Sequence, residues 1–363
     1  MQGTFLIRSI VLAAAVGLSA WVALSQIIPK LGLLNSGKSN REIGYDTDRP
    51  ATSDREGSEA TSPDKIPPGG WIDIVKRTYH EIGRDRVMAV AAGVAFYGLL
   101  AVVPALTAFV SLYGILADPS TIIEHLAAVE SFLPGDAVGL VRDQLIRITS
   151  GDETKLGLAL LIGLALSIWS ANAGVKAIFD ALNVAYGEQE KRGFLRLNLT
   201  SLAFTTGIIV FLVIALGAVA AIPALLARAP LNPSTEWLIW IGRWPVLALV
   251  VMLGLAVLYR FGPSRDEPKW SWVSPGAAFA SAAWLMASAL FSWYVANFED
   301  YNKTYGTLGA VVGLLMWMWL SATIVLIGAE LNSEAERQTL RDTTKGAPMP
   351  IGMRGADAAD RKD

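Results

Sequence analysis

Cysteine is absent from the 363 residues of this chain, and histidine occurs only twice, at His80 and His125. The lack of cysteine excludes disulfides, thiolate nucleophiles, iron–sulfur clusters and cysteine-ligated zinc. Two isolated histidines cannot form a multi-histidine metal site. The sequence also contains no H-E-x-x-H, P-loop or G-x-S-x-G motif. We therefore expect no metal, no cofactor and no catalytic residue, and we predict that the chain is not an enzyme.

Charged residues are also scarce, at 17% of the chain, against about 25% in soluble domains. Hydrophobic residues make up 53%, and the mean hydropathy is +0.44. So few polar residues cannot cover a water-exposed globule, which predicts an integral membrane protein. The formal net charge is −2, so no basic field indicates a nucleic-acid partner.

Long apolar runs are abundant instead. A membrane span needs roughly 20 mostly apolar residues, and six runs reach that length with Arg243 as their one charged residue: 87–117, 156–175, 197–227, 237–259, 270–298 and 304–329. Runs this long suit helices rather than the short alternating strands of a barrel. The sequence therefore predicts an all-α integral membrane protein built on a six-helix transmembrane bundle.

The distribution of Lys and Arg predicts the orientation of the bundle. Sixteen lie before the first run, in alternate connections and in the C-terminal tail, whereas six lie in the other connections. Because cytoplasmic segments retain positive charge, both ends of the bundle should be cytoplasmic. Trp270 and Trp272 should anchor the fifth helix at that membrane surface.

Four segments flank or interrupt the bundle. An apolar stretch within residues 1–35 predicts an additional N-terminal transmembrane helix, with a cleaved signal sequence as the alternative. The polar residues 36–70 predict a disordered linker, and apolar residues at helical spacing predict an amphipathic surface helix over 71–83. Residues 118–154 form the one long outer loop, expected as two short helices capping the bundle, and 336–363 form a cytoplasmic tail.

The second apolar run ends in polar residues that share one helical face. Asn172, Lys176, Asp180 and Asn183 are spaced by four, four and three residues, and Lys176 and Asp180 form an i,i+4 pair. Such a face could line a substrate pathway. Alternatively the hydrocarbon crossing ends near Val175, which leaves the pair in the headgroup layer. Both interpretations stay open at this stage.

Further polar and small residues accompany the last two helices. The connection between them carries a polar cluster that could receive a headgroup or fix the hairpin, with Gly306 expected at positive φ: Asn297, Asp300, Tyr301, Asn302, Tyr305 and Gly306. Glu330 is a further pathway candidate, as a buried partner of a base or as an interfacial charge. Gly309 with Gly313, and Gly217 with Ala221, predict close helix packing.

Three stretches carry a resemblance to a known family: RDRVMAVAAGVAFYGLLAVVPAL from Arg84, WSANAGVKAIFDALNVAYG from Trp169, and YNKTYGTLGAVVGLLMWMWLSATIVLIGAELN from Tyr301. Over roughly residues 71–340 the chain resembles the YihY/virulence factor BrkB family. The resemblance implies a six-helix protein of the bacterial inner membrane with a role in envelope integrity. The family has also carried the label ribonuclease BN, which the lack of histidine-rich motifs here does not support.

Two functions follow from this resemblance and stay open. In the first, the helices pass an amphipathic envelope lipid or a small solute, with Lys176 and Asp180 meeting its charged group. In the second, the protein is a non-transporting scaffold for envelope assembly. The expected partners are membrane lipids, the transported molecule, and a second copy or an envelope protein, but no nucleic acid. A ribonuclease is the third and weakest alternative.

Overall fold

The computed structural model describes residues 56–116, 153–226, 233–297 and 299–360. These ranges are helical, with no β-strand beyond a single isolated bridge between Pro268 and Thr344. Within these described ranges, six helices are long and apolar enough to cross a membrane. The fold is therefore all-α, as the sequence predicts. The proposed N-terminal helix in 1–35 and nearly all of the outer loop 118–154 lie outside the described residues.

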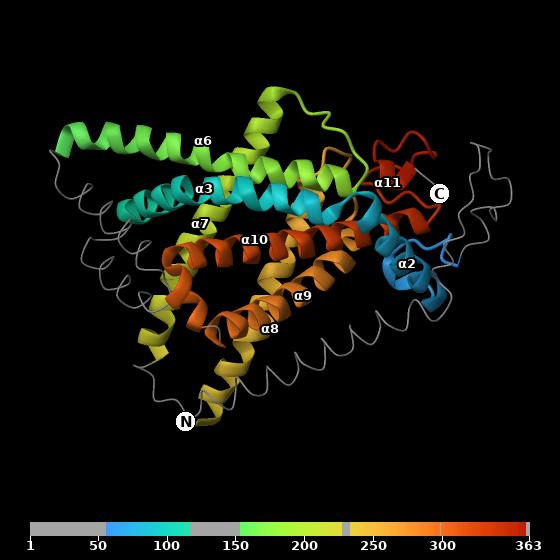
Figure 1. Ribbon diagram of the computed structural model, residues 1–363. Coiled ribbons are helices and arrows are strands. Elements are labelled where there is room, and N and C mark those ends of the chain that lie inside the picture. The colour runs from blue at the N-terminus through green and yellow to red at the C-terminus, as the bar shows by residue number, and fades with distance from the viewer. Residues whose placement is uncertain (1–55, 117–152, 227–232, 298, 361–363) are drawn as a thin grey trace.

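The elements follow the predicted spans closely. They are η2 (Pro63–Lys65), α2 (Pro68–Arg84), α3 (Val87–Leu116), α6 (Glu153–Ala185), α7 (Phe194–Leu226), α8 (Pro233–Phe261), α9 (Trp270–Asn297), α10 (Glu299–Gln338) and α11 (Asp357–Asp360). α3 packs along α6, and α10 packs along α9, α3 and α2. In Figure 1, α3, α6 and α10 run in similar directions, whereas α7 and α8 cross them obliquely. α10 is thus the central element of the bundle.

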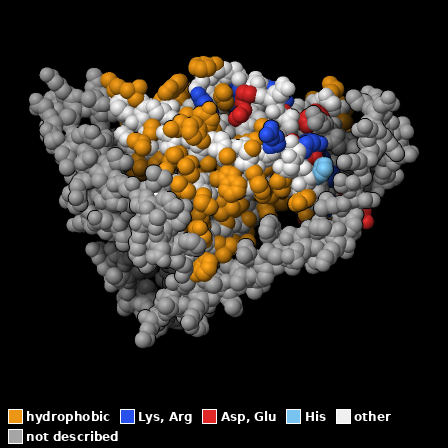
Figure 2. Space-filling view, viewed as in Figure 1, with side chains coloured by type: hydrophobic (Ala, Val, Ile, Leu, Met, Phe, Trp, Pro, Cys, Tyr) orange, Lys and Arg blue, Asp and Glu red, His pale blue; other side chains and the backbone are white. Residues whose placement is uncertain are grey.

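Most of the surface of the spans is apolar and faces outward. Between 11% and 28% of the residues in each span are buried, and Figure 2 shows hydrophobic side chains gathered over the middle of one face. Charged side chains gather toward one end of the same face. An apolar band of this kind is stable in lipid and not in water. The end where α6, α8 and α10 finish, and α7 and α9 begin, is called the polar end below.

One close helix crossing joins α9 and α10 through two glycines, Gly276 and Gly328. A Cβ on Gly328 would lie 2.8 Å from Ala280 Cβ and 2.8 Å from the Gly276 carbonyl oxygen. No described atom lies within 4 Å of a Cβ built on Gly313, so no described helix packs closely on this member of the predicted Gly309–Gly313 pair. Small residues let helices approach only where a neighbour is present. The side chains predicted to pack at Gly217 and Ala221 lie outside the described residues.

Two predicted boundaries differ from the structure. α9 ends at Asn297 and α10 begins at Glu299, so most of the predicted outer connection forms the first turns of α10. Gly306 lies within α10, where no positive φ is required. At the other end α10 continues to Gln338, so residues 336–338 belong to the helix and not to a free tail.

Residues 56–70, predicted as part of a disordered linker, are ordered against α10. The Leu340 amide donates to the Ser58 carbonyl at 2.7 Å, and the Thr339 hydroxyl donates to the Ala60 carbonyl at 2.6 Å. The sequence did not predict this contact, because it is made by hydrogen bonds to backbone carbonyls and not by large apolar side chains. Residues 36–55 lie outside the described part of the chain.

The helix predicted over 71–83 corresponds to α2, Pro68–Arg84, and it has two faces. Ile74, Thr78 and Glu81 are buried against the bundle, whereas Ile72, Val75 and Tyr79 are more than half exposed. An outward apolar stripe beside charged residues suits a helix at a membrane surface.

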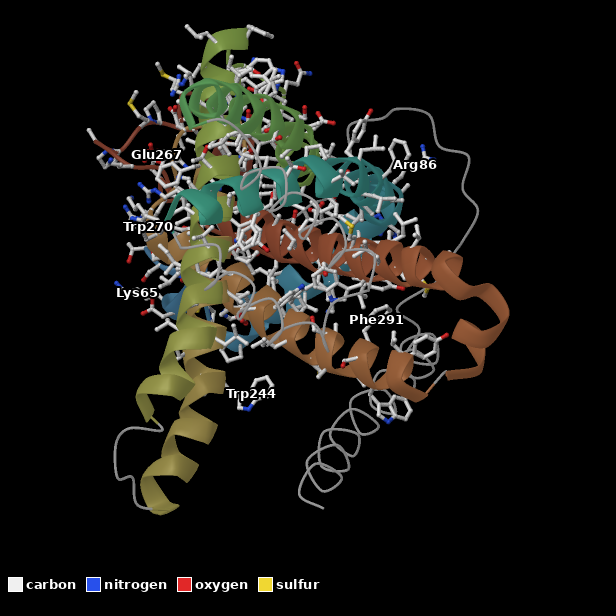
Figure 3. All side chains as sticks on the ribbon, turned by 90° about the vertical axis from the view of Figure 1, so that its left-hand side faces the viewer. Lys65, Arg86, Trp244, Glu267, Trp270 and Phe291 are labelled. Carbon is white, nitrogen blue, oxygen red and sulfur yellow. The ribbon has the colours of Figure 1, made fainter. Side chains whose placement is uncertain are left out.

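One of the predicted tryptophan anchors is wrong. Trp272 is 1% exposed and packs in a small core with Ile74, because its helix buries this face against α2 and α10. Trp270 is half exposed and stacks on the Arg260 guanidinium, 4.5 Å from the ring centre. In Figure 3 it lies beside the loop that carries Glu267, with Trp244 well apart from both.

Candidate functional site

The polar face predicted on the second span lies on α6, which continues to Ala185. The helix does not stop near Val175, since Lys176 and Asp180 do not break a helix. It ends before Gly187, whose φ of +67° is a left-handed conformation that glycine adopts easily. Asn172, Lys176, Asp180 and Asn183 are therefore all helical, but they do not share one environment.

Asn172 forms a hydrogen bond between helices near the middle of two spans. The Thr205 hydroxyl of α7 donates to Asn172 Oδ1 at 3.1 Å, and both residues are at most 4% exposed. They lie close to the centres of Leu161–Ala185 and Phe194–Ala215. Asn172 Nδ2 is buried with no hydrogen-bond partner. A buried donor without a partner costs about 1–3 kcal/mol, so this amide is kept at a penalty.

Lys176 lies one turn closer to the polar end and also contacts α7. Its Nζ donates to Asn198 Oδ1 at 2.6 Å and lies 5.6 Å from the Trp169 ring centre. The predicted pair with Asp180 is not formed, because Lys176 points toward α7 and the Asp180 side chain is exposed. Of the predicted four residues, only Asn172 and Lys176 face α7.

These contacts form a continuous set between two helices, which we name the α6–α7 polar row: Asn172, Lys176, Asn198, Ser201 and Thr205. Ser201 is fully buried and links the two ends of the row. Its hydroxyl donates to the Asn198 carbonyl, and its own carbonyl shares the single hydroxyl proton of Thr205 with Asn172 Oδ1. Sequence reasoning missed the three residues on α7. Asn198, Ser201 and Thr205 at spacings of three and four were the available signal.

Asn183 belongs to a different contact. It accepts from the Ser264 amide at 2.7 Å and donates to Glu190 Oε2 at 3.2 Å. It therefore ties the end of α6 to the α8–α9 loop. Arg192 strengthens the same tie by donating to Glu190 and to the Gly262 carbonyl. This ion pair lowers the pKa of Glu190 to about 2.

The polar end also holds a buried charge network that the sequence did not predict. Arg265 and Glu336 are both 0% exposed and pair through two hydrogen bonds of 2.8 and 3.1 Å. The Arg265 guanidinium lies 4.0 Å from the Tyr186 ring centre, and the Thr343 hydroxyl donates to Glu336. Three separate segments thus meet α10 at one ion pair. Charges are tolerated inside a protein when they are paired in this way.

Glu334 forms the second pair of the network, with two arginines. Arg77 Nε donates to one carboxylate oxygen at 2.6 Å, and Arg337 donates to the other at 2.8 Å. Glu330, one turn earlier on α10, is 1% exposed, and its Oε1 has no hydrogen-bond partner. It is buried, as one of the two sequence interpretations held, but no ion pair with a base is formed among the described residues.

The remaining predicted residues form no site that can be described. Side chains of the outer hairpin cluster, Asn297, Asp300, Tyr301, Asn302, Tyr305 and Gly306, lie outside the described residues. Within the part of the chain that the structure describes, no three His, Cys, Asp or Glu side chains are grouped to hold a metal.

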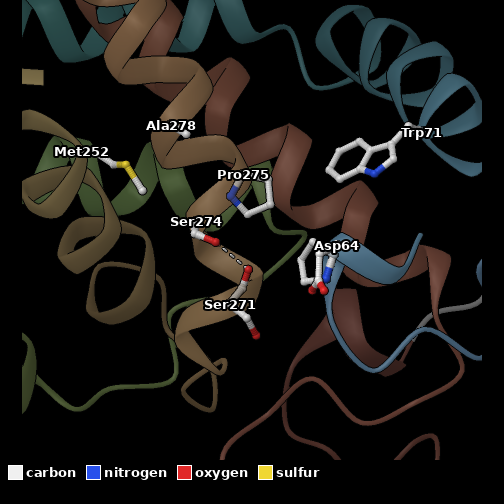
Figure 4. A pocket seen from close by; sticks show the side chains of 8 residues that line it. Asp64, Trp71, Met252, Ser271, Ser274, Pro275 and Ala278 are labelled. Atoms are coloured by element: carbon white, nitrogen blue, oxygen red, sulfur yellow. Dashed lines mark hydrogen bonds between the residues drawn. The ribbon is translucent and has the colours of Figure 1, made fainter. Parts of the chain in front are cut away.

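A shallow groove of about 380 Å³ lies where α2, α8 and α9 meet η2. Figure 4 shows Trp71 on one side and Pro275 and Met252 on the other, with Asp64 at the rim. The Ser274 hydroxyl donates to the Ser271 carbonyl at 2.8 Å, so this polar group is satisfied internally. The groove is mostly apolar and brings no reactive groups together.

Comparison with known proteins gives the family. The model of the virulence factor BrkB family matches residues 78–350. The ribonuclease-like protein YfkH of Bacillus subtilis is 31% identical over 251 residues, which cover 67% of this chain and 88% of that protein. The UPF0761 membrane protein PBPRA3489 of Photobacterium profundum is 26% identical over 277 residues, covering 74% and 82%.

No solved structure matches this chain significantly. The family match spans all six candidate membrane helices, the α6–α7 polar row and the buried charge network apart from Arg77. The chain therefore belongs to the virulence factor BrkB family of membrane proteins.

Proposed function

We propose that this protein moves an amphipathic envelope lipid or a small solute across the bacterial inner membrane, and so serves envelope integrity. The α6–α7 polar row provides the path for its polar group. We propose no enzymatic activity for the chain. We also propose that its C-terminus lies in the cytoplasm, because the Lys and Arg residues concentrate on that side of the bundle.

The observation that carries the proposal is the buried amide of Asn172. Its Nδ2 has no partner at the middle of a span, where polar groups are most expensive. A residue that only joined α6 to α7 would need Oδ1 alone, which Thr205 already satisfies. The donor that is left over is available to a passing acceptor such as a phosphate or hydroxyl oxygen.

Lys176 extends the row toward the polar end. It lies nine residues before the last residue of α6, which corresponds to about 13 Å along the helix. Its side chain is only half-buried and bonds Asn198, a neutral partner. An ammonium group that is not neutralised by a carboxylate can attract an anionic headgroup. The row thus offers a cation near the surface and neutral hydrogen-bonding groups deeper in.

A non-transporting scaffold is the alternative, and the C-terminal segment favours it. Arg354 is 5% exposed and donates to the carbonyls of Leu340, Arg341, Met349 and Ala359. This holds a folded loop on which Met349, Ile351 and Met353 are exposed. Exposed apolar side chains on a fixed loop suit protein contacts. A nuclease is the weakest alternative, since it rests on a relative's name alone.

The test is lipid movement in proteoliposomes. A fluorescent phospholipid in the inner leaflet is followed with a membrane-impermeant quencher, for the wild type, Asn172→Leu and Thr205→Val. Thr200→Val is the matched control, because the Thr200 hydroxyl makes the same i−4 hydrogen bond on α7 but no bond to α6. Size-exclusion profiles and thermal unfolding establish that each variant is folded.

We expect the wild type to accelerate quenching, and Asn172→Leu and Thr205→Val to slow it at least about tenfold, which is about 1.4 kcal/mol on the barrier. Thr200→Val should match the wild type. Equal rates for all four proteins would reject the row as the path. A wild type that behaves like empty liposomes would reject phospholipid transport and move support to the scaffold.

A further inference from the structure

Among the described residues, Glu330 is the one fully buried carboxylate of α10 that forms no ion pair. Its neighbours in sequence are provided for: Glu334 bonds Arg77 and Arg337, and Glu336 bonds Arg265. Glu330 is 1% exposed with an unpartnered Oε1. An ionised carboxylate in such a place costs several kcal/mol even after relaxation. The neutral acid avoids most of this cost.

The charges around Glu330 add to this preference. The charged and titratable groups close enough to act on it electrostatically are Glu81 on α2, Asp85 after α2, Tyr186 after α6, and Glu334 and Arg337 on α10. Acids outnumber bases in this set. Arg337 is committed to Glu334 at 2.8 Å, and Arg84 is committed to Glu81 at 2.7 Å. An ionised Glu330 would therefore be repelled by the neighbouring carboxylates, and no free cation among the described residues would compensate its charge.

Glu81, on α2, is also buried next to other carboxylates, as Glu330 is on α10. Burial raises the pKa of Glu81, and the nearby Glu334 raises it further against the opposing effect of Arg84. α2 and α10 therefore present acidic groups to one another across a buried interface. A proton on one of these groups removes part of the repulsion, and Glu330 can bind it without breaking an ion pair.

We propose that Glu330 is a proton-binding site, and that its protonation keeps the turn between α2 and α3 packed against α10. The proposal goes beyond the transport proposal and does not depend on it. The ligand is a proton taken directly from solution, held on a Glu330 carboxylate oxygen; no other bond is made or broken.

The turn between α2 and α3 contains a residue with a strained backbone, Arg86. Arg86 has φ of +53°, the left-handed region that non-glycine residues rarely adopt. It is labelled in Figure 3 at the junction of the surface helix with the first span. Asp85 ends α2 by donating its amide to the Glu81 carbonyl at 2.8 Å. Loss of the proton from Glu330 would repel Asp85 and Glu81 together and loosen this turn.

Infrared spectroscopy of the full-length protein in lipid nanodiscs tests the proton directly. We expect the wild type at neutral pH to show a carbonyl band of a protonated carboxylic acid that shifts in D₂O. Glu330→Gln should remove this band. Glu190→Gln is the control, because Arg192 holds Glu190 ionised, and it should leave the band in place. A band that persists in Glu330→Gln overturns the proposal.

Two further measurements keep the proposal testable if one variant folds poorly. Unfolded Glu330 is ionised above its ordinary pKa of about 4.3, whereas the proposal gives the folded group a proton at neutral pH. The folding equilibrium constant of the wild type should then fall relative to Glu330→Gln by up to about tenfold per pH unit. Hydrogen exchange at residues 81–90 should accelerate with pH in the wild type beyond the intrinsic chemical rate, and not in Glu330→Gln or Glu330→Met. Parallel pH profiles of the wild type and both variants would overturn the proposal.

Discussion

The two halves of α10 differ in how they are stabilised. Toward the polar end its side chains are buried, and Glu334 and Glu336, at most 2% exposed, are paired with arginines. Toward the other end Val311, Leu314 and Met316 are exposed by more than a third. One continuous helix thus passes from a region organised like the interior of a soluble protein to a region that relies on lipid.

The difference shows where the specificity of this fold arises. Apolar helices gain little by leaving lipid for one another, so apolar contact alone does not select a partner helix. Paired charges and close glycine contacts have geometric requirements that few arrangements satisfy. We infer that the polar end and the α9–α10 crossing determine the arrangement of the bundle, and the exposed apolar faces determine its place in the membrane.

Removing one partner of the buried Arg265–Glu336 pair should have the largest effect. Glu336→Ala leaves the Arg265 guanidinium buried without its carboxylate, which costs about 3–5 kcal/mol. Chemical or thermal unfolding in detergent measures the loss. The matched control is Arg341→Ala, whose pair with Glu59 has side chains 61% and 69% exposed, and which should change stability by less than about 1 kcal/mol. Similar losses for the two variants would contradict the comparison.

Adding a methyl group at the α9–α10 crossing should have the next largest effect. In Gly328→Ala the new Cβ would press on the Tyr259 hydroxyl of α8 and on the Gly276 carbonyl oxygen and Ala280 of α9, at a cost of about 1–3 kcal/mol for the enforced shift. Gly313→Ala, on the same helix, meets no described atom within 4 Å and should be neutral or stabilising by up to about 1 kcal/mol. The two melting temperatures decide between the sites. A destabilised Gly313→Ala would return the predicted Gly309–Gly313 contact to consideration.

The spans were predictable because lipid imposes a local requirement. Any segment that crosses the hydrocarbon must be apolar for about 20 residues, and that property is visible without knowing which helices touch. The helix α2 was predictable from a different local pattern, because apolar residues at helical spacing on one side of a helix are typical of a membrane surface. Helix ends were less accessible, since Lys176 and Glu330 mark the limits of an apolar run and not the limits of a helix.

The polar contacts were not predictable because their partners are distant in sequence. Arg77 meets Glu334 across 257 residues, and Arg265 meets Glu336 across 71. The i,i+4 rule predicted a local pair for Lys176, but a partner on α7 replaced it. Residues 56–60 looked unfit for packing, because side-chain composition says nothing about carbonyls that accept from Leu340 and Thr339.

The smallest expected effect concerns acid stability at the polar end. Arg192 lowers the pKa of Glu190 to about 2, below the ordinary value of about 4.3. The folded-state pKa is depressed, so this pair contributes stability at pH values above about 4.3, and the contribution is lost as the pH falls toward about 2. Because the Glu190 side chain is 28% exposed, solvent screening should keep the contribution near or below about 1 kcal/mol.

Glu190→Gln should therefore flatten this part of the stability–pH profile. The measurement is the melting temperature of the wild type and Glu190→Gln in detergent at several pH values from about 2 to 7. The two curves should converge near pH 2, separate as the pH rises to about 4.3, and stay apart above that value with the wild type higher. Parallel curves would mean that Glu190 adds no stability, and that the hydrogen bonds from Arg192 to the Phe261 and Gly262 carbonyls are sufficient to order this part of the polar end. The polar end would then owe its order to backbone acceptors at this edge and to ion pairs only at its centre.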